Sequence, residues 1–278
     1  MSVDLPYFDD FFDRLAQGPD SHITRVFQRH LHWGYFARPV EGDVSDETFL
    51  AGAEAMTEHV SRAAGVADGQ RILEVGCGFG GTIAHMNDRL SNCHFVGLNI
   101  DERQVRRARE LVTARPTNDV RFVVGDACKI PFPEASFDVV MAVECIFHFP
   151  SRRTFLTEAR RVLRTGGTLM VSDFIANARK FAEMSDWMEA NPNAQGTFFG
   201  SMTPAISSET YAKLGRAKRL ELVQDEDITV ESMPTYPWMK RVYAQNGLPE
   251  GVKTVSFLEE LTRRGFFEYR VLTFRATA

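Results

Sequence analysis

The sequence predicts an α/β fold in which a largely parallel sheet carries helices on both faces. Short strand-like runs alternate with helical stretches through the middle of the chain, a glycine-rich turn leads from the first of these strands into a helix, and the tail alternates with period two. Alternation of strands and helices is typical of parallel sheets, because each crossover helix packs back on the sheet.

The elements of this sheet follow in order from residue 46. Apolar side chains at helical spacing predict a helix over 46–64. Strand-like runs occur at 71–75, 94–98, 120–124, 137–143 and 167–172. Helical stretches lie near 80–90, 101–114 and 151–164. Residues 46–278 are therefore predicted to form the main domain.

Three segments depart from the alternation. Residues 1–45 are rich in aromatic side chains and are predicted to form an N-terminal helical lid on the main domain. Prolines and glycines interrupt residues 175–206, and residues 231–255 belong to a helical pair; both segments are predicted to be caps over the site.

The end of the chain is predicted to return to the sheet. Ser207 can cap a helix that runs to about residue 218, because serine oxygens accept the free N–H groups of a first turn. A strand is expected over 219–229. The tail, residues 266–276, is expected to be a strand at the edge of the sheet.

Composition and charge exclude several classes of protein. With 278 residues, 44% of them hydrophobic, the chain is long enough to bury a substantial core. The net charge is −5 without a long basic stretch, which argues against a nucleic-acid partner. No apolar run approaches the ~20 residues of a membrane-spanning helix.

The cysteines and histidines show no spacing that is typical of a redox pair or a metal site. The four cysteines lie far apart without a CxxC pair, and no leader-like segment precedes Tyr7, so we expect a reducing, cytoplasmic setting. The seven histidines have no metal-ligand spacing, so no metal ion is expected.

A glycine-rich turn, LEVGCGFGG, follows the first strand. Gly76, Gly78 and Gly81 match the GxGxxG pattern of dinucleotide-binding folds, in which glycine lets the backbone approach a ligand closely. Glu74 stands at the end of the strand, where a carboxylate repels a pyrophosphate and attracts an ammonium group. We therefore expect S-adenosyl-L-methionine rather than NAD, with Cys77 bordering it as a filler of the turn.

A second segment, VVGDACKIPF, ends the third strand and suits an adenine. Asp126 is within reach of the exocyclic amine of a base, and the backbone N–H of Ala127 can meet a ring nitrogen. Dinucleotide-binding folds do not require this pair.

Together these motifs resemble the class I S-adenosyl-L-methionine-dependent methyltransferases. The resemblance covers about residues 45–173 and includes the glycine turn, the segment from Gly97 to Gln104, the GDA sequence, FPEASFDVV and RVLRTGGTL, in that order. It implies a Rossmann-like, seven-stranded sheet with an antiparallel last strand, which the tail can supply.

The resemblance assigns the end of the second strand to the ribose. Most such enzymes have an acid there, whereas this chain has Asn99, followed by Ile100 and Gln104. The amide oxygen of Asn99 still accepts a hydroxyl, with a loss of about 1 kcal/mol. Such endings are similar to those of sterol, tocopherol and antibiotic-tailoring methyltransferases. Their LHxGYW segment is similar to LHWGYFA here, which implies that Trp33 and Tyr35 lie near the methionine end of the cofactor.

Candidate catalytic residues follow the fourth and fifth strands. The sequence VECIFHFP places Glu144 and His148 at the carboxyl edge of the sheet, where α/β folds bind ligands. His148 is the candidate base for an acceptor hydroxyl, and Asp173 is the candidate group that orients it or binds the acceptor. Glu144 is expected to help seat the methionine end. The segment resembles rebeccamycin-type sugar O-methyltransferases, but Phe147 replaces the first of their two histidines, and proximity alone is the alternative to a base.

The sequence thus predicts a methyltransferase for a small, hydrophobic natural-product acceptor. O-methylation of a polyketide, sugar or terpenoid alcohol leads, and C-methylation of a terpenoid or aromatic carbon is the alternative. An NAD(P)-dependent oxidoreductase and a non-catalytic binding protein are more distant ones. The acceptor's identity and the formation of a homo-oligomer are left open.

Overall fold

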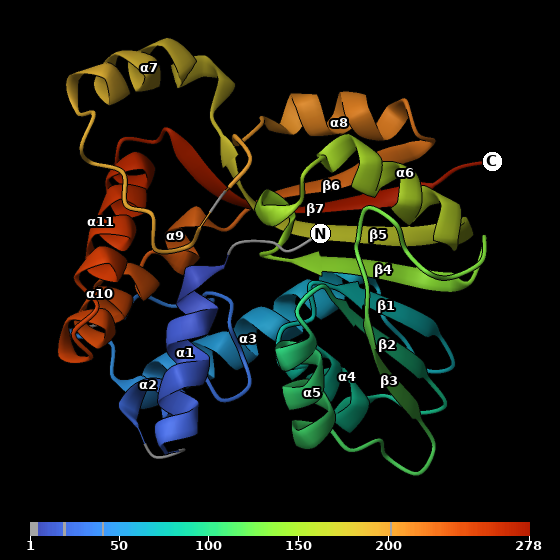
Figure 1. Ribbon diagram of the computed structural model, residues 1–278. Coiled ribbons are helices and arrows are strands. Elements are labelled where there is room, and N and C mark those ends of the chain that lie inside the picture. Colours follow the sequence, from blue (N-terminus) through green and yellow to red (C-terminus); the bar gives the residue numbers. More distant parts are fainter. Residues whose placement is uncertain (1–4, 19–20, 41, 201) are drawn as a thin grey trace.

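A seven-stranded sheet forms the centre of the computed structural model, which describes residues 5–18, 21–40, 42–200 and 202–278 (Figure 1). Parts of the predicted lid and cap, residues 1–4, 19–20, 41 and 201, lie outside the described residues. The strand order is β3-β2-β1-β4-β5-β7-β6. The strands are β1 (Arg71–Val75), β2 (His94–Asn99), β3 (Asp119–Val124), β4 (Phe137–Val143), β5 (Leu163–Ala176), β6 (Leu220–Asp227) and β7 (Phe267–Ala276).

Strand directions confirm the predicted fold. β1 to β5 run parallel, and β7 runs antiparallel to both β5 and β6. β5 extends beyond the predicted residues 167–172, because every residue from Thr168 to Ala176 pairs with β7. The last strand of the chain is thus the antiparallel strand of the sheet.

The prediction that the tail forms the edge of the sheet is wrong. β7 lies between β5 and β6, and β6 is the edge strand. Val271 and Leu272 of β7 are fully buried on opposite faces, whereas β6 exposes charged side chains, as edge strands commonly do. Period-two alternation occurs in both kinds of strand and does not distinguish them.

Three of the helices on the sheet begin at serine caps. Ser45, Ser151 and Ser207 each accept a hydrogen bond from the backbone N–H of the threonine three residues later. Such a side chain satisfies a free N–H group of the first turn. These caps start α3 (Asp46–Ala64), α6 (Arg152–Val162) and α8 (Ser208–Arg216).

The helices cover both faces of the sheet. α3, α4 (Gly81–Arg89) and α5 (Glu102–Leu111) pack on one face, and α6 and α8 pack on the other (Figure 1). Two hydrophobic cores result, with Ile72 of β1 in the first and Leu73 in the second. Neighbouring residues of a strand point to opposite faces, so one strand serves both cores.

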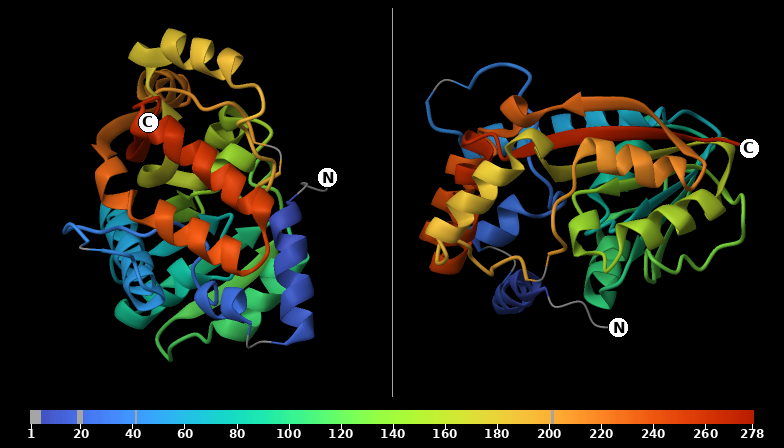
Figure 2. Two further views of the ribbon diagram at one scale, coloured as in Figure 1. Left: turned by 90° about the vertical axis from the view of Figure 1, so that its left-hand side faces the viewer. Right: turned by 90° about the horizontal axis from the view of Figure 1, so that it is seen from above.

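Helices from separate parts of the chain gather beyond the carboxyl ends of β1, β4 and β5 (Figures 1 and 2). They are α1 (Pro6–Gln17), α2 (His22–Val26), α7 (Phe181–Ala190), α9 (Thr229–Ser232), α10 (Thr235–Gln245) and α11 (Pro249–Arg263), with the short helices η1 (Ile146–His148) and η2 (Ala178–Lys180). Phe11 and Phe12 of α1 pack on Phe79 of the glycine turn, with ring centroids 5.1 and 5.9 Å away. Among the described residues, no helix combines the length and apolar composition that crossing a membrane requires.

Candidate functional site

Two cavities adjoin at the carboxyl ends of the parallel strands. The smaller cavity, of about 130 Å³, is lined by residues that end or follow β1, β2, β3 and β4. The larger cavity, of about 440 Å³, is lined by residues of α1, α7, α10 and α11. The residues that line both are Tyr7, Phe8, Leu31, Glu144 and His148. Ligands in the two cavities would therefore meet at these side chains.

The glycine turn forms part of the wall of the smaller cavity. Gly76, Cys77 and Gly78 line it, and the two glycines have φ of 65° and 52°. A Cβ atom on Gly76 would stand 2.5 Å from Cβ of Cys145, and one on Gly78 would stand 2.9 Å from Cδ1 of Leu31. Because glycine has no side chain to clash there, the backbone itself faces the cavity.

Glu74, at the end of β1, is a buried acid in the wall of the smaller cavity. It is 3% exposed, and its Oε2 atom has no hydrogen-bond partner among the described residues. Burial raises the pKa of Glu74 to about 8, while a hydrogen bond with Thr82 opposes the rise. A buried acceptor without a donor is costly unless a ligand supplies one. An ammonium group in the cavity fits this need.

A pair of amides stands at the end of β2. Asn99, Ile100 and Gln104 line the smaller cavity. The Nδ2 group of Asn99 donates to Oε1 of Gln104 at 3.0 Å, and its Oδ1 accepts from the backbone N–H of Asp101 at 3.1 Å. Asp101 itself caps α5 and pairs with Arg103. Hydroxyl groups bound at this point would therefore meet neutral amides.

Asp126 and Ala127, which follow β3, also line the smaller cavity. Oδ1 of Asp126 accepts from the backbone N–H of Cys128 at 2.7 Å, which orients the carboxylate. The structure thus brings the residues predicted at the ends of β1, β2 and β3 to one cavity. Parallel strands end at the same edge of a sheet, which is why these motifs converge.

Trp33 and Tyr35 take different positions from each other. Trp33 lines the larger cavity and packs edge-on against Phe174. Tyr35 lines neither cavity and stacks on His59 of α3, with ring centroids 4.3 Å apart. The backbone N–H of Tyr35 bonds to the carbonyl of Gly52 at 2.9 Å, so the chain turns toward α3 after Trp33. The ring of Tyr35 thus packs on α3, and its predicted position near the methionine end of the cofactor stays a prediction.

Glu144 and His148 share the boundary of the two cavities. Glu144 follows β4 with a φ of 47°, which is uncommon for a residue other than glycine. Its Oε1 atom accepts from the backbone N–H of Trp33 at 2.8 Å and from the hydroxyl of Tyr269. Burial raises the pKa of Glu144 to about 8, although both hydrogen bonds lower it. His148 stacks on Tyr7 with ring centroids 6.2 Å apart.

Asp173 lies apart from both cavities, in β5. It is fully buried, and its Oδ2 atom accepts from Nη2 of Arg152 at 3.2 Å and from the hydroxyl of Tyr211. Its Oδ1 atom has no hydrogen-bond partner among the described residues. Arg152 lines the larger cavity and also donates to Oγ1 of Thr203. The Asp173 carboxylate thus holds Arg152, and its predicted contact with a base or an acceptor stays a prediction.

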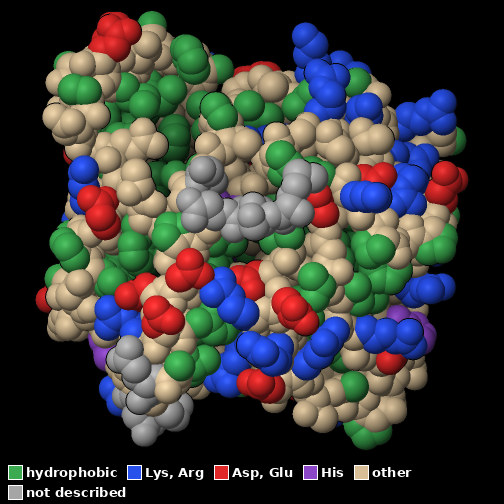
Figure 3. Space-filling model, in the orientation of Figure 1, with side chains coloured by type: hydrophobic (Ala, Val, Ile, Leu, Met, Phe, Trp, Pro, Cys, Tyr) green, Lys and Arg blue, Asp and Glu red, His purple; other side chains and the backbone are tan. Residues whose placement is uncertain are grey.

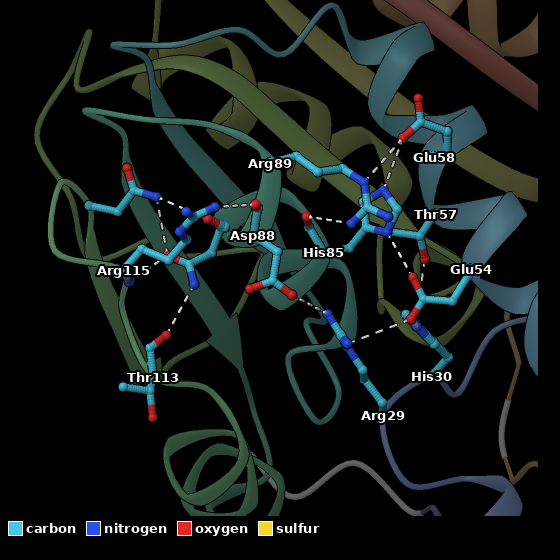
Figure 4. Close-up of polar contacts among 12 residues, drawn as sticks. Arg29, His30, Glu54, Thr57, Glu58, His85, Asp88, Arg89, Thr113 and Arg115 are labelled. Atoms are coloured by element: carbon cyan, nitrogen blue, oxygen red, sulfur yellow. Dashed lines mark hydrogen bonds and ion pairs between the residues drawn. The ribbon is translucent and has the colours of Figure 1, made fainter.

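The sequence did not indicate a histidine and glutamate cluster beside the smaller cavity (Figure 4). His30, which lines that cavity, places Nε2 at 2.8 Å from Oε1 of Glu54, and His85 places Nδ1 at 2.8 Å from Oε2 of the same carboxylate. Nε2 of His85 lies 3.0 Å from Glu58. The ring of His85 therefore bridges two carboxylates of α3.

This cluster joins the N-terminal segment to the sheet helices. His30 precedes α3, Glu54 and Glu58 belong to α3, and His85 belongs to α4. His32, which also lines the smaller cavity, contacts Thr57 of α3 at 3.0 Å. No spacing in the sequence marks these contacts, because they connect three separate elements.

The larger cavity is mainly apolar. Its lining includes Phe147, Phe181, Met184, Phe198, Phe199 and Met239. Phe181 of α7 is 60% exposed, so this wall of the cavity is also reached by solvent. Hydrophobic side chains gather at the upper left of Figure 3, in the region of α7. Apolar linings with a few polar groups are typical of sites for small organic ligands.

Comparison with known proteins identifies the family of the chain. The family described as "Methyltransferase domain" matches residues 73–171. The 27-O-demethylrifamycin SV methyltransferase of Amycolatopsis mediterranei (strain S699) is 30% identical over 247 residues, which are 87% of this chain and 82% of that protein. The sterol 24-C-methyltransferase of Pneumocystis carinii (strain B80) is 28% identical over 199 residues, which are 69% of this chain and 50% of that protein.

A solved structure shares the fold over the whole chain. The geranyl diphosphate C-methyltransferase from Streptomyces coelicolor A3(2), in complex with Mg²⁺, geranyl-S-thiolodiphosphate and S-adenosyl-L-homocysteine, has a TM-score of 0.70 at 19% identity and covers 100% of both chains. The glycine turn, the amide pair and the Oε2 atom of Glu74, which has no partner within the described ranges, fit the cofactor of such enzymes. The chain belongs to the class I S-adenosyl-L-methionine-dependent methyltransferases of the small-molecule type, and S-adenosyl-L-methionine is its cofactor.

Proposed function

We propose that this enzyme methylates a hydroxyl group of a small, hydrophobic natural product: a polyketide, a sugar or a terpenoid alcohol. The observation that carries the proposal is that Glu144 and His148 line both cavities. A cofactor in the smaller cavity and an acceptor in the larger one would meet at these two side chains. The cofactor supplies an electrophilic methyl group on its sulfonium.

The smaller cavity would hold the cofactor through contacts along its length. Glu74 would bind the ammonium group, because its Oε2 has no donor in the part of the chain that the structure describes. Asn99 and Gln104 would meet the ribose hydroxyls, and Asp126 with the N–H of Ala127 would meet the adenine. Gly76, Cys77, Gly78 and Ile100 would pack against the ligand as cavity walls.

Proton removal is assigned to the two residues at the boundary. An acceptor hydroxyl must lose its proton as its oxygen attacks the methyl carbon, and a base that titrates near neutral pH suits that task. His148 supplies an imidazole there. Glu144 supplies a carboxylate whose pKa is raised to about 8 by burial, so a useful fraction is ionised in neutral to mildly basic solution.

The larger cavity would enclose the acceptor. We propose that residues 1–45 act as a lid and that residues 175–206 and 231–255 act as caps, because α1, α7 and α10 line this cavity. Its apolar walls favour a bulky hydrophobic molecule and would exclude water from the transfer. The similarity to 27-O-demethylrifamycin SV methyltransferase supports a natural product as the acceptor. The free thiols of all four cysteines support a reducing, cytoplasmic setting.

C-methylation of a terpenoid or aromatic carbon is the second candidate. The similarity to a sterol 24-C-methyltransferase and the aromatic lining of the larger cavity favour it. An NAD(P)-dependent oxidoreductase is set aside, because the family match and the buried Glu74 both oppose it.

A labelling experiment separates the two candidates. The purified chain is incubated with S-adenosyl-L-methionine carrying a deuterated methyl group and with a panel of polyketide, sugar and terpenoid alcohols and of alkenes. Mass spectrometry and NMR then locate the label. Label on oxygen supports the proposal, and label on carbon supports the alternative. Glu144→Gln should bind S-adenosyl-L-homocysteine and transfer the label much more slowly.

A further inference from the structure

Tyr269 of β7 contacts Glu144, although no sequence motif includes it. Its hydroxyl donates to Oε1 of Glu144 and lies 3.4 Å from Oγ of Ser172. Tyr269 is 1% exposed and lines neither cavity. Tyr269 would therefore affect a ligand in either cavity through its hydrogen bond to Glu144 and not by direct contact.

Segments far apart in the sequence hold Glu144 in place. The backbone N–H of Trp33 donates to the same Oε1 atom at 2.8 Å, and the backbone N–H of Glu144 donates to Oγ of Ser172 at 3.2 Å. The ring of Tyr269 stacks on Phe174, with centroids 4.5 Å apart, which fixes the direction of its hydroxyl. The N–H of Trp33 and the hydroxyl of Tyr269 thus donate to the same carboxylate oxygen of Glu144, which fixes the carboxylate at the boundary of the cavities.

We propose that Tyr269 is a positioning residue, whose hydroxyl holds the Glu144 carboxylate at the junction of the cofactor and acceptor cavities and favours its ionised form. The inference rests on the proposed function, in which Glu144 faces both ligands.

Several titratable groups surround this carboxylate. They are Tyr7 of α1, Cys145, His148 of η1, Asp173 of β5, Tyr236 of α10 and Tyr269 of β7. Burial raises the pKa of Glu144 most and Asp173 raises it further, whereas the hydrogen bonds from Tyr269 and from the N–H of Trp33 lower it. Burial also raises the pKa of Tyr269 well above its ordinary value, so this hydroxyl remains a donor over the whole working range.

The charge of Glu144 can be read from two ligands that differ by one charge. S-adenosyl-L-methionine carries a sulfonium, and S-adenosyl-L-homocysteine does not. An ionised Glu144 should favour the sulfonium, so the ratio of their affinities should rise with pH and level off when Glu144 is ionised. Contacts of Glu74 with the ammonium group are common to both ligands and cancel in the ratio.

The test compares two tyrosine variants by calorimetry between pH 6.5 and 9.5. Tyr269→Phe removes the hydroxyl that contacts Glu144 and leaves the ring on Phe174. The matched control is Tyr236→Phe, because the Tyr236 hydroxyl is also buried but bonds to Thr262. We expect a midpoint near pH 8 for the wild type and for Tyr236→Phe, and a midpoint about one pH unit higher for Tyr269→Phe.

Three outcomes would contradict the proposal or its basis. Equal midpoints in the two tyrosine variants would overturn the role of Tyr269. A ratio that still rises with pH in Glu144→Gln would do the same, because another group would then cause the titration. Failure of the wild type to bind either ligand would contradict the proposed cofactor site itself.

Discussion

The side-chain amide of Asn99 donates to Oε1 of Gln104 across 3.0 Å. This contact uses the one part of Asn99 that an aspartate lacks, namely its NH₂ group. The amide oxygen of Asn99 already accepts from the backbone of Asp101. Asn99 therefore serves two protein contacts as well as facing the smaller cavity, and its partner Gln104 is matched to an amide rather than to an acid.

Replacing Asn99 by aspartate should strengthen cofactor binding. The Gln104 amide can turn to donate its own NH₂ group, and an ionised acceptor binds ribose hydroxyls more strongly than a neutral one. We expect Asn99→Asp to bind S-adenosyl-L-homocysteine about fivefold more tightly, which corresponds to about 1 kcal/mol. Calorimetry at neutral pH measures this. Asn99→Ala should bind more weakly, and unchanged affinity in both variants would show that the ribose lies elsewhere.

The backbone at Gly76 should not tolerate a side chain. Gly76 has a φ of 65°, and an added Cβ would stand 2.5 Å from Cβ of Cys145. Gly76→Ala should lose about 3 kcal/mol of unfolding free energy, from the left-handed backbone and the clash together, and should bind the cofactor poorly. Gly65 is the matched control: its φ is 66°, and among the described residues beyond its chain neighbours no atom lies within 4 Å of an added Cβ.

Gly65→Ala should therefore lose about 1 kcal/mol and keep its affinity for S-adenosyl-L-homocysteine. Urea unfolding and calorimetry on both variants separate backbone strain from the clash. Equal losses of unfolding free energy in the two variants would mean that Cys145 moves aside to accommodate the added Cβ.

The part of the site that could be predicted from the sequence consists of residues that follow parallel strands. Glu74, Asn99 and Asp126 each lie at the carboxyl end of a parallel strand or just after it. Their motifs therefore converge at the carboxyl edge of the sheet, independently of the conformation of the loops. Trp33 and Tyr269 reach Glu144 from outside this repeat, and no spacing along the chain relates them. Their contact depends on how the N-terminal segment and β7 pack, which local patterns do not encode.

Two predicted site residues lie outside both cavities for the same physical reason. Tyr35 follows Trp33 by two residues, but its backbone bonds to α3 and its ring leaves the cavity. Asp173 directly follows the part of β5 predicted from the sequence, residues 167–172, yet a buried arginine pairs with it. In each case a tertiary partner from another element determined where the side chain lies.

Removing the charge of Asp173 should destabilise the fold without weakening cofactor binding. Asp173 and Arg152 are 0% and 6% exposed at their side chains, and Asp173→Asn would leave the guanidinium without its counter-ion. Breaking a buried pair in this way costs about 3 kcal/mol. We expect that loss in urea unfolding, with the affinity for S-adenosyl-L-homocysteine retained.

The exposed pair of Arg264 and Glu260 provides the control. Its side chains are 44% and 42% exposed, so Glu260→Gln should lose less than about 0.5 kcal/mol. If Asp173→Asn were as stable as wild type but bound the cofactor tenfold more weakly, Asp173 would belong to the ligand site after all.

His32 should make the enzyme less stable in mild acid. It is 7% exposed, and burial, reinforced by the neighbouring ring of His30, lowers its pKa from 6.5 to about 3. Below pH 6.5 the unfolded chain therefore binds a proton that the folded chain does not, so unfolding becomes more favourable as the pH falls toward 3. At pH 5 this contributes a loss of about 2 kcal/mol of unfolding free energy relative to pH 8.

Urea unfolding at the two pH values should show that the loss is smaller by this amount in His32→Gln, which cannot titrate. His94→Gln is the control for the substitution itself, because the side chain of His94 is 61% exposed, and it should retain the contribution of His32. Identical pH dependence in the wild type and His32→Gln would mean that His32 takes up its proton in the folded state, and that the contact of its ring with Thr57 does not require a neutral imidazole.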